Sequence, residues 1–332
     1  MHRNKFIAAA LTAVLTLGAS SASLDAANAA IKEDPTPWAL RTPKLGEDTN
    51  LPAALLHSVT NPARVPVGAN NWSCRPSAAH PEPVILVHGT WVNQYSSWAG
   101  LSPILQAQGY CVFVFNYGAT MPAAAVGLLA TADMVQSSYE VAAFVRQVRQ
   151  VTGAAHVALV GYSQGGSQAR YYANLNAPTG EVTKVIGIAP SNHATTLSGI
   201  VTLGNVLGLT GLGFSVLGLV GMPGAAQQAQ PKAPFYVNLN GNGETVAGVT
   251  YTNIITKYDE VVTPYTQGKI KAGKGATVNN ITLQDVCKVD LSEHVSAPYS
   301  KNVAQLVLNA LDPAHPHKVQ CYAQAPIVGG TL

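Results

Sequence analysis

The chain has 332 residues, a formal net charge of +3, and 11% charged against 47% hydrophobic residues. This length is ordinary for one α/β domain, and the composition lacks the basic stripe that nucleic-acid binding needs, so no nucleic-acid partner is expected. The low charge is typical of a protein that meets apolar material. No C-x-x-C pair and no acidic cluster is present, so the sequence predicts no metal site and no cofactor.

Residues 1–29 have the pattern of a secretory signal peptide. Two basic residues precede residues 6–19, which are apolar and uncharged, and residues 27–29 supply an A-x-A cleavage motif. The apolar stretch is short and rich in alanine, which disfavours a retained membrane anchor. We therefore expect cleavage near Ala29 and secretion of a single domain, residues 30–332.

Four cysteines, Cys74, Cys111, Cys287 and Cys321, are expected to form disulfides, because secretion exposes the chain to an oxidising compartment. Three pairings are formally possible. We favour Cys74–Cys111 and Cys287–Cys321, since each pair flanks one half of the fold. Free buried thiols are the alternative.

The predicted elements begin after an irregular arm. Residues 30–83 are rich in Pro, Asn, Ala and Ser with little periodicity, and Trp38 and Trp72 are its expected packing anchors. Residues 84–88 form a continuous apolar run, typical of a strand buried on both faces. The other predicted strands are residues 110–115, 156–160, 182–189 and 250–256, and the predicted helices are 98–108, 134–151 and 299–311. This alternation indicates an α/β fold whose mostly parallel sheet is covered by helices on both faces.

One segment departs from the alternation. Residues 194–231 contain no charge and are dominated by Leu, Val, Ile and Gly. By length alone, residues 198–221 match a membrane span, but their dense glycines disfavour an isolated helix in lipid. We favour an apolar cap, or lid, inserted after the predicted strand 182–189, with apolar surface exposed for an interface. A pair of core helices is the alternative.

The pentapeptide Gly161-Tyr162-Ser163-Gln164-Gly165 follows the predicted strand 156–160 and precedes a predicted helix. A G-x-S-x-G motif between a strand and a helix is the nucleophile elbow of α/β-hydrolases. Glycine on either side gives room for a sharp turn with the serine in strained backbone geometry. The pattern predicts Ser163 as nucleophile, the alternative being a glycine-rich turn with an idle serine.

A serine nucleophile needs a histidine base, and in this fold the chain order is Ser, then Asp or Glu, then His. His193 comes too early in that order, so we expect a structural or substrate-lining role for it. His315 and His317 lie beyond the last predicted helix, in a segment that resembles an exposed tail. His294 stands just before that helix, on a loop that can reach the carboxyl end of the sheet. It is the predicted base.

The acid is expected on a loop after a strand, where it can orient the imidazole. Asp259 and Glu260 both follow the predicted strand 250–256 directly. Asp259 is nearer the strand end and is the predicted acid, whereas Glu260 is expected to be a solvated neighbour. Three further acidic residues are expected to face solvent or to cap the last turn: Asp285, Asp290 and Glu293.

The oxyanion formed at the acyl carbon requires backbone N–H donors aimed at it. Gln164, the residue after the nucleophile, is one predicted donor. Thr90, in the loop after the first buried strand, is the other, and its hydroxyl could add a third bond. Gly89 allows the backbone close to the substrate. His88 is expected to be a hydrogen-bonded structural histidine rather than a catalyst.

These motifs together resemble the secreted, actinobacterial-type triacylglycerol lipases and esterases grouped as class 2 lipases, within the α/β-hydrolase superfamily. The resemblance covers about residues 70–312. It rests on PVILVHGT (83–90), GYCVF (109–113), GYSQGG (161–166), YDEVVTPY (258–265), LQDVC (283–287) and Glu293-His294. The elbow and Thr90 are also similar to those of fungal lipase B, in which a threonine donates through backbone and side chain.

The resemblance implies a triad of Ser163, Asp259 and His294 and a carboxylic ester hydrolase that acts on lipids. We expect a monomer whose partners are the ester substrate and, transiently, a lipid–water interface, with no obligate protein partner. Three alternatives on the same triad stay open: a secreted acyltransferase, a short-chain carboxylesterase and a polyester depolymerase. A hydrolase fold reused as a binding module is disfavoured, because serine, acid and histidine are all present in order.

Overall fold

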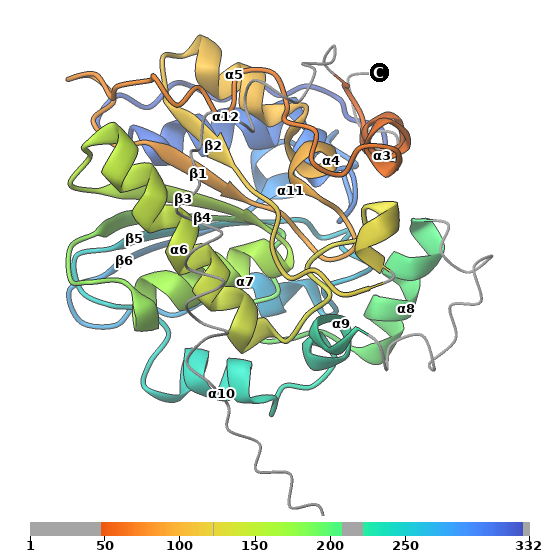
Figure 1. The fold of residues 1–332 in the computed structure, drawn as a ribbon. Helices are drawn as coiled ribbons and strands as arrows, with labels where there is room; N and C mark the ends of the chain where they lie inside the picture. Colours follow the sequence, from red (N-terminus) through yellow and green to blue (C-terminus); the bar gives the residue numbers. More distant parts are fainter. Residues whose placement is uncertain (1–47, 122, 208–221, 328–332) are drawn as a thin grey trace, which may run out of the picture. The chain divides into compact units, whose positions relative to one another are not determined.

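The computed structural model describes residues 48–121, 123–207 and 222–327. The predicted signal peptide and Trp38 lie outside these residues, as does the middle of the 194–231 segment. The described residues contain a six-stranded sheet in the order β2-β1-β3-β4-β5-β6, with every pairing parallel (Figure 1). Its strands are β1 (Val84–Val87), β2 (Val112–Val114), β3 (Val157–Tyr162), β4 (Val182–Ile188), β5 (Thr250–Ile255) and β6 (Thr277–Thr282). The predicted α/β fold with a parallel sheet is confirmed.

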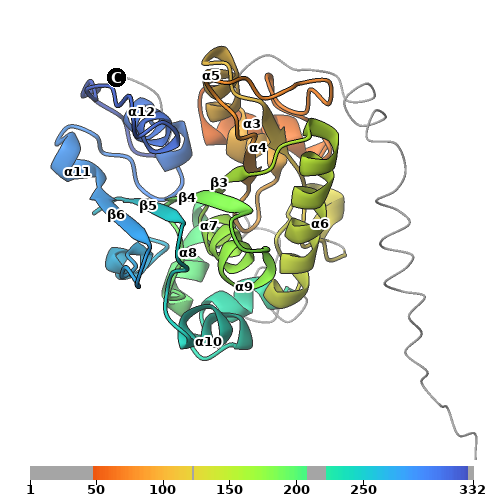
Figure 2. The ribbon, with the colours of Figure 1, turned by 90° about the vertical axis from the view of Figure 1, so that its left-hand side faces the viewer.

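Helices cover both faces of the sheet (Figure 2). They are α3 (Leu51–Val59), α4 (Gln94–Trp98), α5 (Leu101–Ala107), α6 (Met134–Thr152), α7 (Gln164–Tyr171), α8 (Leu197–Val206), α9 (Pro223–Gln228), α10 (Pro234–Gly241), α11 (Leu283–Val286) and α12 (Lys301–Leu311). Short 3₁₀ turns are η1 (Ala123–Val126), η5 (Tyr265–Gly268) and η6 (Ala297–Tyr299), and a π-helical turn, η2 (Tyr172–Asn176), extends α7.

The central strands are apolar throughout because both of their faces are buried. Val84 and Leu86 of β1 pack into the cluster that includes α5 and α12. Ile85 and Val87, which point the other way, pack into the cluster that includes α6. Successive side chains of a strand alternate between its two faces. A strand between two helical layers is therefore apolar on both faces.

The arm expected to be irregular contains a helix, α3. Asn50 caps it by accepting a hydrogen bond from the N–H of Ala53 at 2.9 Å, and a proline lies in its first turn. The expectation of irregular structure is therefore wrong for these nine residues. Trp72 does anchor the arm: its ring lies 5.2 Å from that of Phe113 and 6.0 Å from that of Phe144, between centroids.

Two other elements differ from the prediction. The helix expected at 98–108 corresponds to α5 and begins only at Leu101, because Trp98 ends the separate helix α4 and Gly100 lies between the two; a Cβ at Gly100 would lie 2.8 Å from the Tyr299 ring. The sequence does not predict strand β6, because three of its six residues are exposed, two are half-buried, and they show no apolar alternation. It joins the sheet through backbone pairing with β5.

All four cysteines are paired, Cys74 with Cys111 and Cys287 with Cys321, and their Cα atoms are 5.8 and 5.1 Å apart. The first disulfide ties the segment before β1 to the start of β2. The second ties the end of α11 to the chain that follows α12. The pairing is the one favoured from the sequence, and no free thiol remains.

In the 194–231 segment the structure describes α8 and α9, which contact each other. Within the described ranges, no helix is both long enough and apolar enough to span a bilayer. The two helices are held near the carboxyl ends of the strands. The hydroxyl of Thr195 donates to the carbonyl of Val261, and the indole N–H of Trp91 donates to the sulfur of Met222 at 3.1 Å.

Candidate active site

Ser163 occupies the turn between β3 and α7, with φ 55° and ψ −121°. A positive φ is costly for any residue with a Cβ. The flanking glycines explain how the turn fits. A Cβ at Gly161 would lie 2.2 Å from the carbonyl oxygen of Gly165, and one at Gly165 would lie 2.0 Å from that of Val87. The turn therefore packs backbone directly on backbone, and it presents Ser163 at the carboxyl end of β3.

His294 reaches Ser163 from the loop between α11 and η6. Its Nε2 lies 2.9 Å from Ser163 Oγ. Its backbone is held on both sides, since Tyr162 Oη donates to the carbonyl of His294 at 3.1 Å and its own N–H donates to Glu260 Oε2 at 3.3 Å. The imidazole is fully buried.

Asp259 completes the chain of hydrogen bonds from the loop after β5. Its Oδ2 lies 3.0 Å from His294 Nδ1, and its Oδ1 accepts the N–H groups of Val261 at 3.0 Å and Val262 at 2.6 Å. A carboxylate accepts only, so the Nδ1 proton of His294 must point to Asp259. Nε2 is then free to accept the proton of Ser163.

Two further carboxylates surround His294. Burial by itself would lower the pKa of this histidine, but Asp259, Glu260 and Glu293 together raise it above its usual value. Glu260 is partly buried, and burial raises its own pKa. The expectation that Glu260 is a solvated neighbour is therefore wrong. Its carboxylate is turned inward because it accepts the backbone N–H of His294.

The two predicted oxyanion donors lie beside Ser163. Gln164 is the first residue of α7, and the opening N–H groups of a helix have no partner within it. Gly89 is close to Ser163, since a Cβ there would lie 3.2 Å from Ser163 Cβ, and Thr90 follows it. In the turns, loops and caps of the described chain, neither the backbone N–H of Thr90 nor that of Gln164 donates to a backbone carbonyl. The Thr90 hydroxyl accepts a bond from Gln164 Nε2 at 3.0 Å.

His88 has no role in this arrangement. Burial lowers its pKa to about 4. Nδ1 lies 2.8 Å from the carbonyl oxygen of Gly89, and Nε2 accepts the N–H of Tyr117 at 3.3 Å. Both ring nitrogens are thus occupied, which confirms the structural interpretation of this residue.

The remaining histidines lie apart from Ser163, His294 and Asp259. His193 Nε2 lies 3.2 Å from Glu244 Oε1 and its Nδ1 lies 3.0 Å from the carbonyl oxygen of Gln267. His315 is exposed and pairs with Asp312. His317 is also exposed, at the rim of a surface groove. In the part of the chain that the structure describes, none of the three hydrogen-bonds to Ser163, His294 or Asp259.

Of the three other acidic residues, Asp285 is exposed and pairs with Lys257 at 2.5 Å. Asp290 and Glu293 are buried instead of facing solvent. Asp290 accepts the Ser300 hydroxyl at 2.7 Å, and Glu293 accepts the N–H of Ser296 at 3.1 Å. Of the two roles expected, solvent exposure is wrong for both residues; each instead accepts backbone N–H groups within the turns of the loop that carries His294.

One contact at the site has no sequence signal. Gln228, at the end of α9, donates to Thr90 Oγ1 at 2.6 Å from 138 positions away. No motif surrounds Gln228, so only the folded chain brings it to the site. Among the described residues, no group of His, Cys, Asp or Glu is arranged to hold a metal ion.

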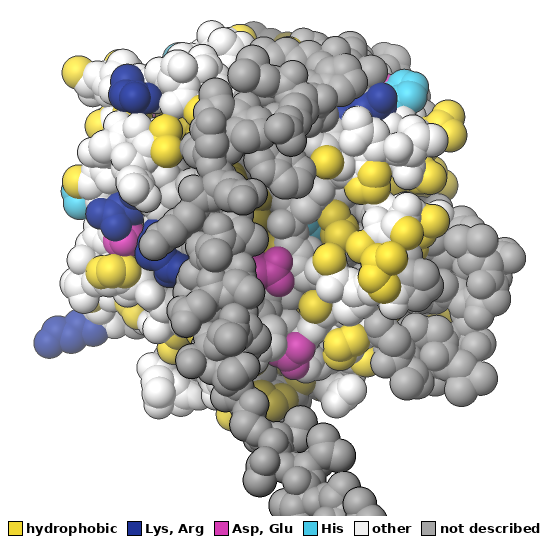
Figure 3. All heavy atoms as spheres, in the orientation of Figure 1, with side chains coloured by type: hydrophobic (Ala, Val, Ile, Leu, Met, Phe, Trp, Pro, Cys, Tyr) yellow, Lys and Arg dark blue, Asp and Glu magenta, His cyan; other side chains and the backbone are white. Residues whose placement is uncertain are grey.

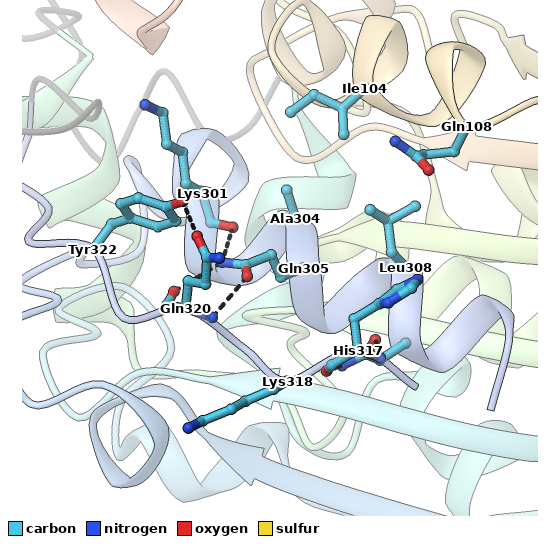
Figure 4. Close-up of a pocket in the computed structure, with 11 residues that line it drawn as sticks. Ile104, Gln108, Lys301, Ala304, Gln305, Leu308, His317, Lys318, Gln320 and Tyr322 are labelled. Carbon is cyan, nitrogen blue, oxygen red and sulfur yellow. Dashed lines mark hydrogen bonds between the residues drawn. The ribbon is translucent and has the colours of Figure 1, made fainter. Parts of the chain in front are cut away.

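The surface groove beside His317 has a volume of about 590 Å³ and lies between α5, α12 and the chain that follows α12 (Figure 4). Ile104 and Leu308 are among its apolar residues, and Lys301 and Lys318 are its cations. It shares no residue with the Ser163 site, so it adds nothing to the geometry around Ser163.

The family model described as Lipase (class 2) matches residues 81–306, more than half of the chain and all of the site above. The chain belongs to the class 2 lipase family. Two curated relatives are named triacylglycerol lipase, from Pseudarthrobacter phenanthrenivorans and from Burkholderia plantarii, each 36% identical over 101 residues. These alignments cover 29% of this class 2 lipase chain, and 29% and 26% of the respective relatives.

Among solved structures, Aspergillus fumigatus lipase B superposes with a TM-score of 0.56 at 19% identity, over 77% of this chain and 56% of that one. A similarity at this identity concerns the fold alone. It agrees with the parallel sheet and the helical layers described for this class 2 lipase, and the α/β-hydrolase fold is confirmed.

Proposed function

We propose that this class 2 lipase hydrolyses carboxylic esters of lipids, most of all triacylglycerols, with Ser163, His294 and Asp259 as its catalytic triad. The observation that carries the proposal is the continuous chain from Ser163 Oγ to His294 Nε2, at 2.9 Å, and from His294 Nδ1 to Asp259 Oδ2, at 3.0 Å. Such a chain makes a serine hydroxyl nucleophilic.

In the first half of the reaction, Ser163 Oγ attacks the ester carbonyl carbon while His294 Nε2 takes the hydroxyl proton. Asp259 keeps the imidazole in the required tautomer and stabilises its positive charge. The N–H groups of Thr90 and Gln164 bind the oxyanion. His294 then gives its proton to the leaving alcohol, and an acyl-enzyme remains.

In the second half, a water molecule gives a proton to His294 and attacks the acyl carbon. Collapse of this intermediate returns the proton to Ser163 Oγ and releases the fatty acid. The chemistry is the same for any ester, so the triad does not determine substrate specificity. Specificity must come from the surface around the site.

Two features favour lipid esters over small soluble ones. The uncharged segment 194–231 supplies α8 and α9 beside Thr90 and Trp91. Hydrophobic side chains also gather on the face near α3 and η1 (Figure 3), where Leu56 and Met121 are 72% and 75% exposed. Apolar surface of this kind is typical of a protein that contacts an interface. The relatives named triacylglycerol lipase fit the same substrate class.

The proposal extends to the processing, location and oligomeric state of the protein. We assign residues 1–29 as a signal peptide cleaved near Ala29, residues 30–332 as one secreted domain, and residues 194–231 as its cap. The protein acts as a monomer at a lipid–water interface. The two disulfides support an extracellular location, because such bonds persist in oxidising surroundings.

The test is hydrolysis of 4-nitrophenyl esters from acetate to palmitate, and of emulsified triolein, by the wild type and by Ser163→Ala. We expect rates that rise with chain length and on the emulsion, and loss of activity in the variant. Activity confined to short soluble esters would leave the triad in place and make the protein an esterase. Activity that survives in Ser163→Ala would overturn the mechanism.

A further inference from the structure

The carboxamide of Gln228 is buried against the predicted oxyanion loop. Its side chain comes from α9, in the segment after β4, and is 2% exposed. Its Nε2 donates to Thr90 Oγ1 at 2.6 Å. Thr90 Oγ1 also accepts a bond from Gln164 Nε2, at 3.0 Å. The hydroxyl of Thr90 therefore faces two donors at once.

Both amides are fixed in this orientation by their other contacts. Gln164 Nε2 also donates to the carbonyl of Ala130 at 3.1 Å, while its Oε1 accepts the hydroxyl of Tyr117 at 3.3 Å. Gln228 Oε1 accepts from Ser191 Oγ at 3.4 Å. Gln228 Nε2 also donates to the carbonyl of Gly224 at 3.4 Å. Reversing either amide would place its oxygen against a carbonyl oxygen, that of Ala130 or that of Gly224, which can only accept.

A threonine hydroxyl has one proton to donate and two lone pairs that accept. The two amides fill both lone pairs of Thr90 Oγ1. Among the hydrogen bonds of the described residues, its own proton is given to none. The proton must point away from both amides, and the loop that carries Thr90 lies against Ser163 through Gly89.

We propose that Gln228 is a positioning residue that, together with Gln164, aims the hydroxyl proton of Thr90 at the oxyanion. The inference rests on the proposed hydrolase function and adds to it a link from the cap to the reaction. An oxyanion donor is effective when it is oriented before charge develops. Without Gln228 one lone pair of Thr90 is free, the hydroxyl rotates, and its proton no longer has a single direction.

The experiment compares kcat and KM for 4-nitrophenyl butyrate, a soluble ester, in Gln228→Met and Gln227→Met. The Gln227 side chain is the matched control: it lies on the same helix and donates to Asp133 rather than to Thr90. We expect kcat to fall about tenfold in Gln228→Met with little change in KM, which is less than the ~100-fold lower end for outright loss of an oxyanion donor, because the Thr90 hydroxyl is still present. Gln227→Met is expected to keep its kcat.

A double-mutant cycle with Thr90→Val separates positioning from structure. Thr90→Val alone is expected to lose about 100-fold in kcat, and adding Gln228→Met is expected to cost nothing more. An equal further loss in the Thr90→Val background would overturn the proposal, as would an equal loss in Gln227→Met. Thr90→Ser, which keeps the hydroxyl, should retain most of the activity and respond to Gln228→Met as the wild type does.

Two controls keep the outcomes distinct. Labelling of Ser163 by a fluorophosphonate counts the active sites, so kcat refers to folded enzyme in every variant. If Ser163→Ala is inactive but neither Thr90→Val nor Gln228→Met changes kcat, the triad stands and the positioning role is wrong. If Ser163→Ala stays active, the proposed function itself fails.

Discussion

Gly165 approaches β1 so closely that no side chain fits there. A Cβ would lie 2.0 Å from the carbonyl oxygen of Val87, a backbone atom that cannot move aside without bending the strand. We expect Gly165→Ala to lower the free energy of unfolding by about 3 kcal/mol, the upper range for overpacking. A Cβ at Gly241, at the end of α10, would meet nothing within 4 Å. Urea unfolding of Gly165→Ala and Gly241→Ala makes the comparison.

Gly241→Ala is expected to be neutral or to stabilise by about 0.5–1 kcal/mol, because alanine favours a helix over glycine. Similar midpoints for the two variants would contradict the close packing of the turn. A Gly165→Ala protein that folds but fails to react with a fluorophosphonate would still agree with it, since the turn that presents Ser163 would have shifted.

The charges around His294 set the acid limb of the pH profile. Ester hydrolysis needs the neutral imidazole, so kcat/KM rises as pH passes upward through the pKa of His294. Asp259, Glu260 and Glu293 raise that pKa, which places the limb above the usual histidine value. In Glu260→Gln one of these charges is gone, and the imidazolium is less favoured. The limb is expected to move to lower pH.

A pH–rate profile of kcat/KM on a soluble ester measures this shift. Asp285→Asn is the control, because Asp285 is exposed and pairs with Lys257 instead. Its profile should overlay that of the wild type. An unmoved limb in Glu260→Gln would mean that the carboxylate does not act on the pKa of His294.

At the level of elements, the two disulfides close loops of similar length, with separations of 37 and 34 residues. Chain entropy alone then predicts similar losses of stability, about 2–4 kcal/mol, when either is replaced by alanines. Their positions differ. Cys287 begins the chain that leads to His294, and the carbonyl of Cys287 accepts the N–H of Asp290 at 3.1 Å.

We therefore expect Cys287→Ala with Cys321→Ala to lose more kcat than Cys74→Ala with Cys111→Ala at equal loss of stability. Guanidinium unfolding and kcat on a soluble ester, both at a temperature where each variant is folded, give the comparison. Equal kcat in the two double variants would show that the loop carrying His294 holds its geometry without the second disulfide.

How much of this the sequence predicts depends on where the determining contacts lie. The apolar run at 84–88 and the periodicity at 134–151 encode burial directly, and both elements are found within a residue or two. Helix α3 and strand β6 carry weak patterns, because α3 depends on its cap and β6 on backbone pairing. The signal for β6 is tertiary, whereas that for α3 is local: a capping Asn50 followed by a proline in the first turn.

The residues of the candidate site also differ in whether a local or a tertiary signal marks them. Ser163, Asp259 and His294 each stand beside a strand end or helix start that local sequence marks, and the structure brings the three together. Gln228 and the inward turn of Glu260 depend on partners that only the fold supplies. No local pattern distinguishes either residue from a surface amide or a surface acid.

At the scale of the whole molecule, the apolar face near the site should govern action on emulsions. Asn93 ties α3 to the chain after η1, since its Nδ2 donates to Ser58 Oγ at 3.0 Å and to the carbonyl of Gly127 at 3.1 Å. Leu56 and Met121, both largely exposed, therefore lie on neighbouring elements. Immersing one such side chain in lipid contributes about 1.5–3 kcal/mol.

Replacing both residues by serine is accordingly expected to lower the rate on emulsified triolein at least about tenfold. The rate on soluble 4-nitrophenyl butyrate should stay the same, because both side chains are largely exposed whereas Ser163 and His294 are buried. Val289→Ser, which removes an exposed apolar group next to the Cys287–Cys321 disulfide, is the control and should leave both rates unchanged. Equal losses on both substrates in Leu56→Ser with Met121→Ser would mean that this face supports the fold rather than the interface.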